Sequence, residues 1–72
     1  MYEINGEKLK YYIYSHDLSL AAVARSIGFM PNYFYYCLNN NRLSKTAVKR
    51  IYDKYNINPG RYITGWKGET EK

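Results

Sequence analysis

The sequence predicts a single small all-α domain made of five short helices over residues 1–63. Its 72 residues are too few for two separate hydrophobic cores, because domains usually need about 100–200 residues. Alternating strand patterns are scarce, whereas helix-start signals recur along the chain. Residues 64–72 contain glycine and mixed charges, so we expect them to form a flexible C-terminal tail.

The first two expected helices each begin after a capping residue. Asn5 caps a helix that runs to about Ser15, and Ser19 caps a shorter second helix, because their side-chain oxygens can accept free N–H groups of the first turn. Gly28 then ends the second helix, since glycine adopts a positive φ without strain. Each cap is flanked by an apolar pair that can form a hydrophobic staple, namely Ile4 with Leu9 and Leu18 with Val23.

The remaining helices follow from proline and serine signals. Pro31 starts a third helix that reaches about Leu38, and Ser44 caps a fourth that continues to about Tyr55. A last short helical turn is expected at Pro59, where Ile57 faces Tyr62. The fourth helix has a core-facing stripe at helical spacing, formed by Val48, Ile51, Tyr52 and Tyr55.

Residues 18–38 have the layout of a helix-turn-helix. Ala24 is small enough for two helices to cross closely, and Gly28 suits the turn between them. The side chains expected in their shared core are Val23, Ile27, Phe34, Cys37 and Leu38. A small domain often buries a wide stripe of a helix, which leaves open whether Tyr33 or Tyr35 also turns inward.

The order of the elements resembles the lambda-repressor and Cro family over about residues 4–63. The resemblance rests on Leu-Ser at 18–19, on Val-Ala at 23–24 and Ile-Gly at 27–28, and on the segment NINPGRYI at 56–63. It implies a lambda-repressor-like helix-turn-helix domain, whose third helix enters the DNA major groove in that family. A helical bundle that shares only the periodicity is the alternative interpretation.

The outward side of the third helix supplies the candidate contact residues. A rotation of about 100° per residue places Asn32, Tyr36 and Asn39 opposite the core, with Tyr33, Tyr35 and Asn40 beside them. The Asn32 carboxamide could pair with adenine. However, Pro31 occupies a position where the family often has a polar side chain that contacts bases, and Tyr36 is bulky with a single hydroxyl. Both residues argue against direct recognition of bases.

The charge distribution points away from the third helix as a DNA-binding element. A net charge of +5 and a pI of about 9.4 favour nucleic acid as a partner at first sight. However, residues 26–41 contain no Lys, Arg, Asp or Glu, and residues 1–41 carry no net charge, so the excess lies in residues 42–72. Ten tyrosines and an uncharged helix are more typical of a protein–protein interface.

This combination is similar to the modulator-of-repression proteins of temperate phages from Gram-positive hosts. The resemblance implies an antirepressor in the bacterial cytoplasm, which binds a CI-type repressor through its third helix and keeps it off operator DNA. The alternative is a Cro-like repressor that binds operator DNA directly with the same helix. Under that alternative the expected phosphate contacts are Ser19, Arg42, Lys45 and Lys49.

Several other classes of protein are not expected. Cys37 and His16 are the single cysteine and histidine, so no zinc set exists and we expect neither a metal nor a cofactor. His16, Asp17 and Ser19 are crowded in one segment and predict a loop with a helix cap, not an active site. No run approaches the roughly 20 apolar residues of a membrane span, and the chain does not begin like a signal peptide. The oligomeric state stays open.

Overall fold

The computed structural model describes residues 1–66, which fold mainly into α-helices. The helices of this region are α1 (Gly6–Ser15), α2 (Leu20–Ser26), α3 (Pro31–Asn39) and α4 (Lys45–Tyr55), followed by a 3-10 helix, η1 (Pro59–Arg61). The prediction of a mostly helical domain is confirmed. The prediction of five helices is wrong in number, because the last piece is a single 3-10 turn of three residues.

The helices begin where the capping signals predicted. Asn5, Ser19 and Ser44 each accept a hydrogen bond from the backbone N–H three residues later, at 3.1, 3.0 and 3.2 Å. The start of α3 has no side-chain cap and depends on Pro31, whose missing N–H costs nothing at the first helical position. After α2, Gly28 takes a φ of +81°, which turns the chain into α3.

Two short strands were not predicted from the sequence. They are β1 (Tyr2–Glu3) and β2 (Arg42–Leu43), which pair antiparallel with Tyr2 opposite Leu43. The N-terminal segment also contacts the end of the domain, where the Thr64 N–H donates to the Glu3 carbonyl at 3.0 Å. The purely all-α expectation is corrected accordingly: a minimal two-stranded sheet ties the N-terminus to the segment between α3 and α4.

Asn41 fastens this N-terminal segment to the end of α3. Its backbone adopts a left-handed φ of +57°, so its carbonyl accepts the Ile4 N–H and its side-chain oxygen accepts the Gly6 N–H, both at 2.9 Å. Gly6 lies so close to α3 that a Cβ built there would collide with the Leu38 carbonyl oxygen. The start of α1 and the end of α3 therefore form one tightly packed joint.

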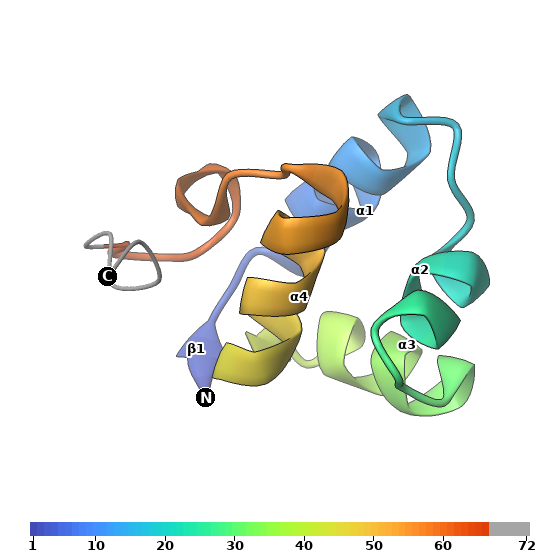
Figure 1. Cartoon of the computed structure of the whole chain (residues 1–72). Helices are drawn as coiled ribbons and strands as arrows, with labels where there is room; N and C mark the ends of the chain where they lie inside the picture. Colours follow the sequence, from blue (N-terminus) through green and yellow to red (C-terminus); the bar gives the residue numbers. More distant parts are fainter. Residues whose placement is uncertain (67–72) are drawn as a thin grey trace.

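One hydrophobic core holds the domain together. Figure 1 shows α2 and α3 next to each other on one side of the molecule, with η1 on the other. The five residues expected to face the core from α2 and α3 are all buried, so that prediction is confirmed. In α4, Val48 and Ile51 are buried, while Tyr52 and Tyr55 are half-buried at its edge. None of the helices within residues 1–66 combines the length and apolar character needed to cross a bilayer.

Trp66 folds back onto the domain. Its half-buried ring contacts the Tyr2 ring edge-on, with centroids 5.5 Å apart and an interplanar angle of 74°. Of the expected flexible tail, residues 67–72 lie outside the described part of the chain.

The joint between α1 and α3 makes the substitution Gly6→Ala informative. Helix propensity alone favours alanine by about 1 kcal/mol, whereas the collision with Leu38 predicts a loss of about 2 kcal/mol, as for overpacking elsewhere. We expect Gly6→Ala to lower the free energy of unfolding, measured by urea denaturation. Lys8→Ala, at an exposed position of the same first turn, should change it by less than about 0.5 kcal/mol. A stabilised Gly6→Ala protein would contradict the close contact.

The buried hydroxyl of Tyr62 predicts an unusual response to pH. It has no hydrogen-bond partner, and burial raises the pKa of Tyr62 above its ordinary value. Above about pH 10 the unfolded chain therefore loses this proton more easily than the folded chain, which lowers stability. Tyr62→Phe should stabilise the protein by about 1 kcal/mol at pH 7, and its advantage should grow above pH 10 in urea titrations.

The matched control is Tyr55→Phe. The Tyr55 hydroxyl lies 2.6 Å from the Ser26 hydroxyl, so removing it should destabilise the fold by about 1 kcal/mol. Equal effects of the two substitutions would show that the Tyr62 hydroxyl is satisfied in solution.

Candidate functional site

The buried side of α3 determines which of its side chains face the solvent. Phe34, Cys37 and Leu38 are at most 3% exposed and hold the helix in the core. Helical geometry then turns Asn32, Tyr36 and the two asparagines at 39–40 outward, and all four are exposed. Neither of the tyrosines whose burial was left open is in the core, because Tyr33 is 46% exposed and Tyr35 is half-buried.

An aromatic row leads from the turn into α3. The Tyr33 and Tyr36 rings are stacked with their centroids 6.5 Å apart. The Phe29 ring also contacts the Tyr33 ring, with a distance of 5.6 Å between the two ring centroids. Tyr36 is 64% exposed and Met30, which precedes the helix, is 73% exposed. Large side chains are therefore exposed to solvent on this side of the domain. Each of them could bury considerable surface area against a partner.

Met1 completes this surface from the other end of the chain. Pairing of β1 with β2 brings it beside α3, where it is 69% exposed. A hollow of about 410 Å³ is lined by Met1, Tyr33, Tyr36, Cys37, Asn40 and Arg42. We call Met1, Met30, Tyr33 and Tyr36 the tyrosine face. Sequence reasoning missed Met1, because no local pattern signals a contact between residues so far apart.

Tyr35 and Asn39 lie on the opposite flank of α3. They border a separate hollow of about 420 Å³, which is otherwise lined by Lys10, Tyr14, Ser19, Leu20 and Ala21. The Lys10 ammonium donates to the Asn39 side-chain oxygen at 3.1 Å, so Asn39 is already engaged. Of the six expected contact residues, Tyr33, Tyr36 and Asn40 thus border the hollow beside the tyrosine face, and Tyr35 and Asn39 border the hollow on the α1–α2 side. Asn32 is exposed and lines neither hollow.

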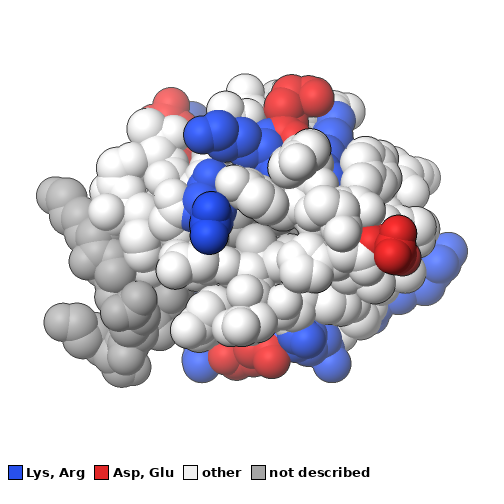
Figure 2. All heavy atoms as spheres, turned by 90° about the horizontal axis from the view of Figure 1, so that it is seen from above, with Lys and Arg blue, Asp and Glu red and all other residues white. Residues whose placement is uncertain are grey.

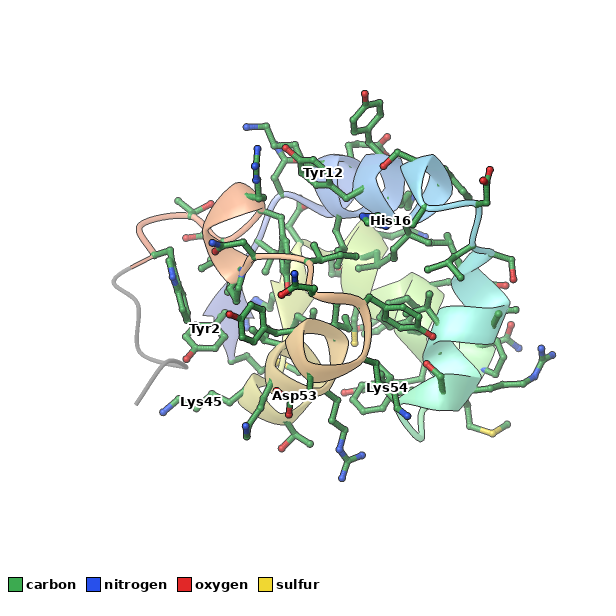
Figure 3. The ribbon with its side chains drawn as sticks, turned by 45° about the horizontal axis from the view of Figure 1, so that its top comes forward. Tyr2, Tyr12, His16, Lys45, Asp53 and Lys54 are labelled. Atoms are coloured by element: carbon green, nitrogen blue, oxygen red, sulfur yellow. The ribbon has the colours of Figure 1, made fainter. Side chains whose placement is uncertain are left out.

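The residues expected to contact phosphates are also divided. Ser19 and Arg42 each border a hollow beside α3, whereas Lys45 and Lys49 belong to α4. The Lys49 ammonium is paired with the Asp53 carboxylate at 3.3 Å. Figure 3 shows Lys45 extending outward from α4, and on the face in Figure 2 the basic groups stand at separate places with acidic groups among them. Within residues 1–66, the four expected phosphate contacts therefore come from the start of α2, from β2 and from α4.

The side chains of the tyrosine face are those of two methionines and two tyrosines. A hydrogen bond with the Cys37 thiol, together with the charge of that group when ionised, raises the pKa of Tyr33 above its ordinary value. The hydroxyl therefore keeps its proton well beyond neutral pH. Among the side chains that line the adjoining hollow in the described part of the chain, that of Arg42 is the charged one.

The segment between α1 and α2 serves as a turn. His16 follows the last residue of α1, Asp17 takes a φ of +58°, and the Ser19 hydroxyl caps α2. The predicted loop with a helix cap is what these residues form. Elsewhere in residues 1–66, no group of three His, Cys, Asp or Glu side chains is placed to hold a metal ion.

Comparisons of the chain with protein-family models, curated proteins and solved structures find no match in any of the three.

Two aromatic residues of α3 should differ sharply in their effect on stability. Phe34→Ala removes a fully buried ring and should cost about 3–5 kcal/mol. Tyr36→Ala removes a ring that is 64% exposed and should change the free energy of unfolding by less than about 1 kcal/mol. Urea denaturation of both variants tests this. A large loss in Tyr36→Ala would mean that Tyr36 belongs to the core and is not free for binding.

Proposed function

We propose that this chain is an antirepressor of a phage genetic switch, a modulator of repression that binds a CI-type repressor. The proposal takes α2, the turn and α3 as a helix-turn-helix of the lambda-repressor and Cro kind, in the bacterial cytoplasm. The observation that carries it is the tyrosine face: large, exposed and uncharged side chains on and beside the helix that such domains use for recognition.

The chemistry of the tyrosine face suits a protein partner better than DNA. Interface centres are enriched in aromatic residues and methionine and depleted in charge. DNA affinity instead depends strongly on cations that neutralise phosphates. Arg42 supplies such a charge beside this face, while Lys49 is neutralised locally by Asp53. A protein surface with a complementary apolar patch therefore fits the site best.

Binding of this kind would block repression by competition. If the tyrosine face covers the DNA-binding domain of the repressor, the same repressor surface cannot lie in the operator groove. The hollow beside Tyr33 and Tyr36 offers about 410 Å³ into which an apolar side chain of the repressor could insert. Anchors in such pockets dominate binding energies.

A Cro-like repressor is the second candidate function. It is favoured by the exposure of Asn32 at the start of α3 and by the positions of Ser19 and Arg42 on the two flanks of that helix. In this alternative Asn32 and Tyr36 read bases, while Ser19, Arg42, Lys45 and Lys49 contact phosphates.

The effect of Tyr36→Ala on repressor binding tests the proposed function. We expect the affinity for the repressor encoded beside this protein to fall by about 2 kcal/mol or more, roughly 30-fold, as for a central interface aromatic. Isothermal titration calorimetry without DNA measures this change. Tyr11→Ala is the matched control, because Tyr11 is 67% exposed but lies on α1, and it should leave the affinity unchanged.

Mixing this protein with the repressor, with and without operator DNA, separates the two candidate functions. A complex that forms without DNA and releases the repressor from its operator supports the antirepressor. If the pure protein instead forms no complex but shifts operator DNA at low salt, with affinity falling steeply as salt is added, the Cro-like alternative is correct.

A further inference from the structure

A third hollow lies between the end of α2 and the outer part of α4. It has a volume of about 520 Å³ and is lined by Arg25, Ser26, Ile27, Gly28, Arg50, Asp53 and Lys54. It shares no lining residue with either hollow beside α3. The tyrosine face therefore does not account for it.

Hydrogen bonds between α2 and α4 hold its walls in place. The Arg50 guanidinium donates to the Ile27 carbonyl at 2.8 Å. The Ser26 hydroxyl donates to the Val23 carbonyl at 2.8 Å and lies 2.6 Å from the Tyr55 hydroxyl, which must then be the donor in that second bond. These bonds hold Arg50 and Ser26 in place before a ligand enters, which reduces the conformational entropy that these two side chains lose on binding.

Gly28 lies close to the Arg50 guanidinium. A Cβ at this position would lie 3.2 Å from the Arg50 Nη1 atom, so a larger residue would crowd the guanidinium. The positive φ of +81° at Gly28 turns the chain away at the same point. Arg50 can therefore lie across the end of α2 with further N–H groups left for a ligand, because a guanidinium has five.

The charge around the hollow is predominantly positive. Arg25, Arg50 and Lys54 surround it, and its single acidic lining residue, Asp53, is paired with Lys49 at 3.3 Å. Figure 3 shows Lys54 at the end of α4 near α2, and Asp53 on the outward side of α4. Arg25 lies in the half of the sequence that has no net charge, far along the chain from Arg50 and Lys54. The cluster of three cations therefore exists only in the folded chain.

We propose that this hollow is a second interaction surface, which receives an acidic segment of a protein partner. Carboxylate side chains can enter a concavity of this size and bind guanidinium groups through paired hydrogen bonds. A DNA duplex is bound by cations that follow its phosphate backbone, whereas this hollow is a concavity whose cations come from two separate helices, Arg25 from α2 and Arg50 and Lys54 from α4. Such a surface also accelerates association with an acidic partner.

A hexaglutamate peptide is the probe that tests this proposal. Titrated into the ¹⁵N-labelled full chain at low salt, it should shift the amide signals of residues 25–28 and 50–54 and lose affinity as salt is raised. Arg25→Gln with Lys54→Gln should weaken binding at least about tenfold. The control pair, Lys8→Gln with Arg61→Gln, removes the same charge elsewhere and should weaken it less than about twofold.

Three results would overturn the proposal. Equal weakening by both pairs would mean that only net charge attracts the peptide. Lower thermal stability of the Arg25 and Lys54 variant with unchanged peptide affinity would mean that these cations only stabilise the ends of α2 and α4. Preferential shifts at the same amides with a short DNA duplex, and none with hexaglutamate, would identify a nucleic-acid surface instead.

Discussion

The joint between the start of α1 and the end of α3 is the constraint on which the arrangement of this domain depends. Asn41 binds two backbone N–H groups of the N-terminal segment, one through its carbonyl and one through its side chain. Because Gly6 lies so close to the end of α3, Asn41 can reach the N–H groups of both Ile4 and Gly6. Through this joint β1 pairs with β2, and Met1 arrives beside Tyr33 and Tyr36.

Much of the helical fold could be predicted from the sequence because its signals are local. The caps at Asn5, Ser19 and Ser44 bind N–H groups only three residues away, so the relevant residues are neighbours in the chain. The strands could not be predicted, since two residues show no alternation and their pairing spans residues 2 and 43. The end of α3 near Leu38 was predicted, but the bonds of Asn41 to the N-terminal segment depend on tertiary packing and have no local signal.

The candidate site was predictable to a similar degree. Helical periodicity correctly separates the buried Phe34 and Cys37 from the exposed Tyr36. It could not show that Tyr35 belongs to the α1–α2 flank, because this depends on where Tyr14 and Leu20 are placed. Counting charges along the sequence located the uncharged segment, but it assigned Arg25 and Lys54 to different halves of the chain. The fold places both residues around one hollow.

The pairing of β1 with β2 also has a consequence for the order of folding. Tyr2 and Leu43 enclose a loop of about 40 residues, and closing such a loop costs chain entropy before any contact compensates for it. The helices α2 and α3 meet across a short turn and share core residues, so they can associate early. We therefore expect α3 to pack against α2 first, and the wall that Met1 adds to the hollow beside Tyr33 and Tyr36 to form late.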